Sequence, residues 1–303
     1  MAKTPEETIL AHENNADANS ETGIERHFVE IAGLKIFYQT AGNKGIPTLL
    51  IHGGGSDSSE FAWKHIIGKL GNNRRVIAID LPGYGKSQMP SLNSMQNPFL
   101  YHIEFIGTFL KEMQIHKSNL VGISMGGGIS LGAALAHPEL IEKLVLVDSY
   151  GLGKKMIGGI STYLASRTPY FNEVLRFILQ KNRWAVKAGL KNLVYNPDLV
   201  TDAFVDEAWQ ALRSARMHPA WKAFQKHEVT ISGYRTDFRE QFPGINKPVL
   251  IIHGKNDKLI PLEGAISAHQ DIPGSQLITL ENCGHLPPRE VPDRFVDILN
   301  KFL

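Results

Sequence analysis

Short runs of Val, Ile and Leu recur along most of this sequence, and segments of helical length and spacing separate them. The runs are TLLIHGGG (48–55), RRVIAIDLPGYGKS (74–87), SNLVGIS (118–124), EKLVLVDS (142–149), KPVLIIHGKND (247–257) and SQLITLENCGH (275–285). Runs that are apolar on both faces are typical of buried parallel strands, whereas residues 99–114 and 126–137 have helical spacing. This alternation predicts an α/β fold with a doubly wound, mostly parallel sheet.

Two parts of the chain depart from this alternation. HFVEIAGLKIFYQTAG, residues 27–42, alternates in polarity around a glycine turn, which predicts an antiparallel hairpin. From about residue 152 to about 235 the spacing is that of amphipathic helices, and we find no strand pattern. We therefore expect an α/β core formed by residues 24–151 and 236–303, with a helical cap, residues 152–235, inserted over one end of the sheet.

The inserted segment carries three of the four tryptophans of the chain, Trp184, Trp209 and Trp221. Large aromatic residues at helical spacing usually anchor a core, so we expect most of the three to be buried between helices. Asn196 followed by Pro197 predicts the start of a helix, with Asn as the cap and Pro in the first turn.

Composition limits the class of protein. The chain has 303 residues, is 43% hydrophobic and has a formal net charge of +2, without the basic stripe that nucleic-acid binding requires. Residues 1–23 are polar and lack an apolar core, which predicts a flexible N-terminus and no secretory signal. No apolar run reaches the roughly 18 residues of a membrane helix. Cys283 is the single cysteine, so no internal disulfide requires an oxidising compartment, and we expect a cytoplasmic protein. We expect it to bind a small molecule and neither nucleic acid nor membrane. A homo-oligomer is compatible with the sequence.

The pentapeptide Gly122-Ile123-Ser124-Met125-Gly126 matches the pattern G-x-S-x-G and lies between an expected strand and an expected helix. On such a turn the backbone of the serine is strained, and the flanking glycines remove side chains that would collide with neighbouring elements. The hydroxyl is then presented at the carboxyl edge of the sheet, near the positive end of the following helix. The turn alone does not distinguish a nucleophile from a tight packing joint, so a base and an acid are needed.

Both follow later strand runs. His285 comes directly after the last run, and Asp257 after the preceding one. Because the carboxyl ends of parallel strands meet at one edge of a sheet, Ser124, Asp257 and His285 can converge as a nucleophile, an orienting acid and a base. Asp148, which also follows a strand run, is the alternative acid, and we favour Asp257.

Acyl transfer also requires donors for the developing oxyanion. The HGGG segment, residues 52–55, follows a strand run, and its glycines allow close approach of the backbone to a substrate. We expect the N–H groups of Met125 and Gly54 to form the oxyanion hole, with Gly55 as the alternative to Gly54. The histidines of the two loops, His52 and His253, are expected to support them by hydrogen bonds.

Taken together, HGGG, DLPGYGKS, GISMGG, HGKND and CGH resemble the motifs of serine hydrolases of the α/β-hydrolase fold with a helical cap, over about residues 24–303. The resemblance implies a Ser124–His285–Asp257 triad, an acyl-enzyme intermediate and no cofactor. Within the cap, LVYNPDLVTDAFVDEAWQAL resembles the meta-cleavage-product hydrolases, which cut a carbon–carbon bond in a dienone acid from aromatic-ring degradation, and related carboxylesterases.

Several positions depart from the meta-cleavage-product pattern. Ile123 stands where that group usually has Asn, and Leu286 where it usually has Trp. The cap Arg that binds the substrate carboxylate would fall near 207–209, where this chain has none, although Arg213 or Arg216 could replace it. An apolar site without that Arg favours a neutral substrate. We therefore expect a hydrolase of small, largely apolar carboxylic esters. Carbon–carbon hydrolysis is the alternative, and a non-catalytic receptor for a small ligand is the alternative of another class.

Other ligand motifs are incomplete. GYGKS resembles the end of a phosphate-binding loop, but the first glycine of that pattern is replaced by Asp80. Ser124 replaces the second glycine of the dinucleotide fingerprint. The histidines are dispersed, and no Cys/His cluster predicts a metal site. We therefore expect no cofactor and no metal.

Overall fold

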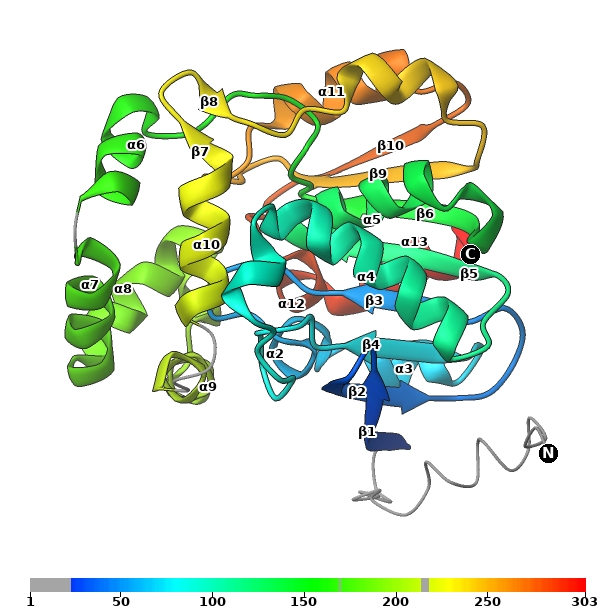
Figure 1. The fold of residues 1–303 in the computed structure, drawn as a ribbon, viewed down its shortest axis with the longest axis horizontal. Coiled ribbons are helices and arrows are strands. Elements are labelled where there is room, and N and C mark those ends of the chain that lie inside the picture. The colour runs from blue at the N-terminus through cyan, green and yellow to red at the C-terminus, as the bar shows by residue number, and fades with distance from the viewer. Residues whose placement is uncertain (1–22, 169, 214–217) are drawn as a thin grey trace.

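A central sheet of eight strands organises the computed structural model, which describes residues 23–168, 170–213 and 218–303 (Figure 1). Its order is β1-β2-β4-β3-β5-β6-β9-β10. The strands are β1 (Ile24–Ile31), β2 (Leu34–Ala41), β3 (Thr48–Ile51), β4 (Val76–Ile79), β5 (Ser118–Ile123), β6 (Ile141–Val147), β9 (Val249–Gly254) and β10 (Gln276–Leu280). β1 and β2 form the predicted antiparallel hairpin, and β2 pairs antiparallel with β4. The pairs β4–β3, β3–β5, β5–β6, β6–β9 and β9–β10 are parallel. The predicted fold class is confirmed.

The sheet is covered on both faces because its central strands are apolar on both. Every residue of β3, β4, β5 and β9 is buried. Alternate residues point to opposite faces, so Leu49 and Ile51 pack in one core cluster and Leu50 in the other. Helices of the first face are α4 (Pro98–Glu112), α5 (Met125–Ala136) and α11 (Leu262–Asp271), and those of the second are α2 (Ser59–Trp63), α3 (Ile67–Gly71) and α13 (Pro292–Phe302).

Five helices lie between β6 and β9 in the chain and gather beside the sheet (Figure 1). These inserted helices are α6 (Gly159–Arg167), α7 (Phe171–Lys181), α8 (Arg183–Leu193), α9 (Asp202–Arg213) and α10 (His218–Glu228). They have a small core of their own, in which Leu190, Phe204 and Ala208 are buried. The exact division into core and cap at residues 152 and 235 stays a prediction.

The remaining elements are short. They are η2 (Leu92–Met95), η3 (Pro138–Leu140), η4 (Pro197–Leu199), η5 (Arg239–Gly244), α12 (Pro287–Glu290), β7 (Val229–Thr230) and β8 (Gly233–Tyr234). The antiparallel pair β7–β8 corrects the expectation that no strand lies between 152 and 235. Each strand has only two residues, too few for an alternating pattern to be visible in the sequence.

The helix start expected at Asn196 is only partly correct. The Asn196 side chain accepts a hydrogen bond from the Asp198 N–H at 3.0 Å, and Pro197 opens a turn. The turn is a three-residue 3₁₀ helix, and the chain leaves helical conformation at the buried Val200 (ψ +69°). The full helix, α9, begins at Asp202.

The tryptophans also differ from expectation. Trp184 is 76% exposed, so the prediction of a core anchor is wrong for this residue. Trp209 is half-buried, packs against the core of the inserted helices and donates its indole N–H to the Gln180 carbonyl at 2.9 Å. Trp221 is half-buried and packs against the main core. The predicted flexible segment 1–23 lies outside the described residues except for Gly23. None of the described helices is long and apolar enough to cross a membrane.

Candidate active site

Ser124 lies on a sharp turn between β5 and α5. Its backbone has φ +54° and ψ −122°, a region that L-residues rarely adopt. The turn requires glycine on both sides. A Cβ at Gly122 would lie 2.2 Å from the Gly126 carbonyl oxygen, and one at Gly126 would lie 2.3 Å from the carbonyl oxygens of Ile51 and His52. The sequence thus places a half-buried hydroxyl at the carboxyl edge of the sheet.

His285 and Asp257 meet at the same edge. The Nδ1–H of His285 donates to Asp257 Oδ2 at 2.7 Å, and the side chain of Asp257 is 1% exposed. Asp257 is also held by the N–H of Leu259, at 2.7 Å from its Oδ1. Burial opposes its ionisation, but the charge and the hydrogen bond of His285 outweigh burial, and the pKa of Asp257 lies below its usual value. Asp257 is therefore ionised at neutral pH.

The loop that carries His285 is fastened by its backbone. The His285 N–H donates to the Leu193 carbonyl at the end of α8, at 2.7 Å. Glu290 accepts hydrogen bonds from the N–H groups of Gly284 and Leu286, and from that of Tyr195 at 2.7 Å. The sequence analysis did not identify Glu290. Its position five residues after His285 was the one indication that it holds the histidine loop.

Asp148, the alternative acid, is fully buried behind this pair. Its Oδ1 accepts the Gly254 N–H at 2.9 Å, and the residue has a positive φ of +41°. Burial and the neighbouring charge of Asp257 raise the pKa of Asp148 well above its usual value, which favours the neutral carboxyl. His253 donates to the Ile260 carbonyl at 3.1 Å, which supports the Asp257 loop.

Among the described residues, Asp148, Asp257 and His285 form the one group whose spacing would suit a metal ion, with ligand atoms within 4.8 Å of one another. The hydrogen bond between His285 and Asp257 already uses one atom of each. We therefore interpret the cluster as an imidazole oriented by the Asp257 carboxylate, with Asp148 buried behind that carboxylate.

The HGGG loop follows β3 and lies beside Ser124. His52 donates from Nδ1 to the Gly53 carbonyl at 2.7 Å and accepts the Leu81 N–H on Nε2 at 3.1 Å, an arrangement that fits the neutral ring. Burial lowers the pKa of His52, in agreement with that tautomer. The N–H groups of Gly54 and Met125 have no acceptor among the described residues, so both remain available to a bound oxygen.

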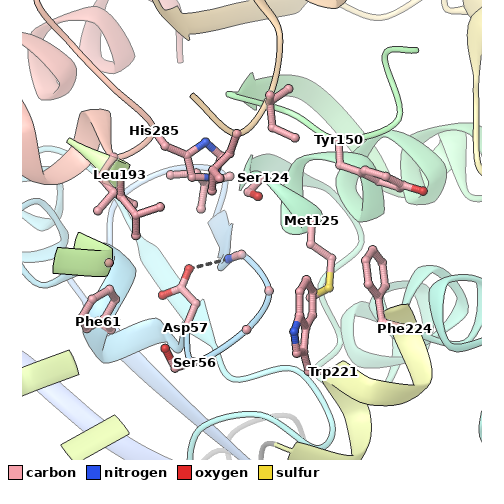
Figure 2. A pocket seen from close by; sticks show the side chains of 18 of the residues that line it. Ser56, Asp57, Phe61, Ser124, Met125, Tyr150, Leu193, Trp221, Phe224 and His285 are labelled. Atoms are coloured by element: carbon pink, nitrogen blue, oxygen red, sulfur yellow. Dashed lines mark hydrogen bonds between the residues drawn. The ribbon is translucent and has the colours of Figure 1, made fainter. Parts of the chain in front are cut away.

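Asp57 was not foreseen in the sequence. Its Oδ2 accepts the Gly53 N–H at 2.7 Å and its Oδ1 accepts the Ser58 N–H at 2.9 Å, which closes the loop (Figure 2). Burial raises the pKa of Asp57, while His52 and His285 oppose that rise. In the sequence Asp57 stands two residues after the glycine run, but its orientation depends on hydrogen bonds that no periodicity reveals.

A cavity of about 450 Å³ opens over these groups, between the HGGG loop and the inserted helices. Figure 2 shows Ser124 and His285 on one wall, Asp57 on the next, and Trp221 and Phe224 facing them. Most of the wall is apolar: the inserted helices contribute Leu179, Val186, Leu190, Leu193, Ala208, Leu212, Trp221 and Phe224. No Lys or Arg is found among the described residues of the lining.

The candidate carboxylate-binding arginines are elsewhere. Arg213 is exposed and lies over the ring of Trp209, 5.2 Å from its centroid, and Arg216 lies outside the described residues. Glu207 occupies the expected position of the cap arginine and pairs with Arg289 at 2.8 Å. The structure therefore brings Ser124, Asp257 and His285 together as predicted, whereas the sequence did not reveal the polar environment of the pocket.

Comparison with known proteins agrees with this geometry. A model of the alpha/beta hydrolase fold family matches residues 47–289. The chain is 31% identical over 290 residues to the 2-hydroxy-6-oxo-6-(2'-aminophenyl)hexa-2,4-dienoic acid hydrolase of Metapseudomonas resinovorans, covering 94% of this chain and 92% of that protein. It is also 31% identical over 279 residues to the uncharacterized hydrolase YugF of Bacillus subtilis (strain 168), covering 90% and 96%.

Among solved structures, a serine hydrolase involved in carbazole degradation superposes with a TM-score of 0.75 at 28% identity, covering 91% of this chain and 97% of that one. The chain belongs to the α/β-hydrolase fold family and is a hydrolase. The resemblance to meta-cleavage-product hydrolases, first inferred from motifs, is confirmed.

Proposed function

We propose that this protein hydrolyses small, neutral, largely apolar carboxylic esters through an acyl-enzyme on Ser124. One observation carries the proposal: a serine on a strained turn shares an apolar cavity with a carboxylate-paired imidazole, and the described lining has no cation. An imidazole whose Nδ1 faces Asp257 has Nε2 left for the nucleophile.

In the first half-reaction, His285 Nε2 takes the proton of Ser124 as Oγ attacks the ester carbonyl carbon. The electron pair of the carbonyl moves to its oxygen, which the N–H groups of Met125 and Gly54 stabilise. The bond to the leaving oxygen then breaks, and His285 returns the proton to the alcohol. Asp257 stabilises the imidazolium throughout without taking its proton.

In the second half-reaction, His285 removes a proton from a water molecule that attacks the acyl carbon. The bond to Ser124 Oγ breaks, and the proton on His285 returns to that oxygen. The acid is released and the enzyme is restored. No step needs a metal or an organic cofactor.

The charge of the pocket favours a neutral substrate. The described lining has no Lys or Arg to pair with a substrate carboxylate, and Asp57, when ionised, would repel one. The relative from Metapseudomonas resinovorans is named for a dienoic acid, which is anionic at neutral pH. We infer that the two pockets select substrates of different charge.

Carbon–carbon hydrolysis of a dienone acid is the second candidate, because the relative from Metapseudomonas resinovorans is named for such a substrate. A non-catalytic receptor is the third, since a cavity of about 450 Å³ under inserted helices could also hold a ligand without turnover.

Steady-state kcat/KM for a short aryl ester and for a dienone acid separates the three, with Ser124→Ala as the control for background hydrolysis. The proposal predicts a large preference for the ester that disappears in the variant. Preference for the dienone acid would transfer the assignment to carbon–carbon hydrolysis. Turnover of neither, together with tight ligand binding, would support the receptor.

A further inference from the structure

The outer surface of α6, α7 and the beginning of α8 is apolar. We call it the outer face and define it by Ile160, Leu164, Val174, Phe177, Ile178 and Trp184, each between 47% and 76% exposed. No residue of α6 is buried. In Figure 1, α6 and α7 stand at the edge of the molecule that is remote from β1 and β2. Exposed apolar side chains that gather on neighbouring helices are typical of an interaction site.

Helix α7 shows that the exposure is directional. Its polar side faces the protein: Glu173 pairs with Lys222, and Gln180 donates to the Leu212 carbonyl at 2.8 Å. Its apolar residues Val174, Phe177 and Ile178 occupy the opposite side, which faces solvent. In a helix that only covers a core, these two sides would be exchanged.

The same segment is strongly basic. Between residues 154 and 193 the sequence has eight Lys and Arg residues and one acidic residue, Glu173, although the whole chain has a net charge of only +2. Lys181 follows Phe177 by four residues on the same side of α7, and Lys191 follows Trp184 by seven on α8. Neither lysine has an acidic partner among the described residues. Positive charge thus borders the outer face.

These features distinguish between two occupants. A second copy of the chain, docked through the same face about a two-fold axis, would bring two faces bordered by positive charge together. An anionic lipid surface would instead accept the apolar side chains among its acyl chains and attract the bordering lysines, as it does for basic amphipathic helices. Trp184 has the amphipathic ring that is favoured at such interfaces.

The outer face and the cavity are two sides of the same helices. Leu179 of α7 and Val186 and Leu190 of α8 line the cavity above Ser124. A protein docked through the outer face would therefore hold its cavity within a few helix diameters of the lipid, where apolar molecules concentrate.

We propose that the outer face of α6, α7 and α8 docks this protein on the surface of anionic lipid membranes, in place of the expectation from the sequence that it binds no membrane. The docking is peripheral, because no described helix can span a bilayer. It does not depend on the substrate proposed above, and its test does not use the reaction.

Flotation of the full chain with vesicles tests the proposal. One set contains equal parts phosphatidylglycerol and phosphatidylcholine, and the other contains phosphatidylcholine alone. The protein is expected to float with the mixed vesicles, to bind the neutral ones at least about tenfold more weakly, and to dissociate as salt shortens the Debye length. Phe177→Asp and, separately, Trp184→Asp should each weaken binding by about tenfold or more.

Ile46→Asp is the matched control. Ile46 is also an exposed apolar residue (43%), but it lies just before β3, at the amino end of that strand and outside the inserted helices. It should float like the unchanged protein. Near-UV circular dichroism and the melting temperature establish that each variant is folded. The proposal is overturned if the unchanged protein stays unbound, or if both outer-face variants float as it does. A dimer that Phe177→Asp dissociates, without any vesicle binding, would assign the face to a second copy.

Discussion

The carboxyl edge of the sheet and the outer face of the inserted helices differ in which side chains are buried: polar ones at the edge, and none of the apolar ones on the outer face. At the sheet edge, polar groups are buried and paired: His285 with Asp257, and Asp148 with the Gly254 N–H. On the outer face, apolar side chains meet solvent while Glu173 turns inward to an ion pair. In each region polarity lies where folding alone would not put it, and in each we infer a function. Composition, averaged over the chain, conceals both.

The two regions also differ in how firmly they are held. At the sheet edge Ser124 and Asp148 keep positive φ values that only a tightly packed surrounding can enforce. The inserted helices have a small core, and α6 buries no residue at all. We therefore expect the inserted helices to open at lower free energy than the sheet.

The largest effect is expected at Ser124. Ser124→Ala should lower kcat by about a million-fold, the scale seen when a serine nucleophile is removed, because no other group in the cavity replaces the hydroxyl. The unfolding transition in urea should barely move, since only one oxygen atom is lost. An unchanged kcat, measured on the aryl ester, would exclude Ser124 as the nucleophile.

The next largest effect is a difference in kcat between substitutions of the two buried acids, Asp257 and Asp148. Asp257→Asn should lower kcat by roughly 10⁴-fold, because the amide cannot stabilise the imidazolium. Asp148→Asn should change kcat by less than about tenfold, because His285 is held by Asp257 and an amide oxygen can still accept the Gly254 N–H. Comparable losses in both variants, from rates measured side by side, would show that the acids share the role.

Stability should distinguish a buried aromatic from an exposed one within the inserted helices. Phe204 is 2% exposed and lies under the Arg289 guanidinium, so Phe204→Ala should lower the free energy of unfolding by about 3–5 kcal/mol. Trp184→Ala should change it by less than about 0.5 kcal/mol. Urea titration of both variants gives the comparison. Equal losses would mean that Trp184 is packed after all.

Asp57→Asn tests whether the Asp57 carboxylate contributes to the selection between neutral and anionic substrates. If the ionised form of Asp57 repels the substrate carboxylate, its replacement should raise the dienone-to-ester ratio of kcat/KM by roughly tenfold, which corresponds to about 1.4 kcal/mol. The ratio is the readout because any disturbance of the Gly53 loop affects both substrates. A constant ratio would remove Asp57 from substrate selection.

The smallest effect is a pH dependence. The raised pKa of Asp148 means that the folded chain keeps a proton that the unfolded chain loses near pH 4. This contribution to stability is full below the unfolded pKa and is lost as pH rises through the folded pKa. The free energy of unfolding should therefore fall with rising pH relative to Asp148→Asn, as urea titrations at several pH values would reveal. A parallel pH profile in the variant would contradict the raised pKa.

The sequence predicts the sheet edge well for physical reasons. Strands such as β5 and β9 are buried on both faces, so their apolar runs are continuous, and the residue after each run must lie at the carboxyl edge. That rule led to Asp257 and His285, whose contact the structure then gives as a hydrogen bond. Their roles in catalysis, with those of Ser124 and the two amides, stay proposals.

What the sequence did not reveal depends on orientation rather than on pattern. The spacing of apolar residues in α7 shows that the helix has two faces, but not which face packs against the protein. Trp184 has the helical spacing expected of a buried residue, although it is exposed in the structure. Asp57 is turned into the loop by two backbone N–H groups, and Glu290 gathers three. Such contacts join residues whose neighbours in space are set only by the finished fold.

The most direct test of the central claim is the labelling of the full chain with a p-nitrophenyl alkylphosphonate, followed by intact mass and peptide mapping. Our account predicts one phosphonyl group per chain, on the peptide that contains Ser124, and slower labelling in Asp257→Asn. Ser124→Ala should remain unlabelled. Absence of an adduct, or stoichiometric labelling of another residue, would contradict an acyl-enzyme at Ser124.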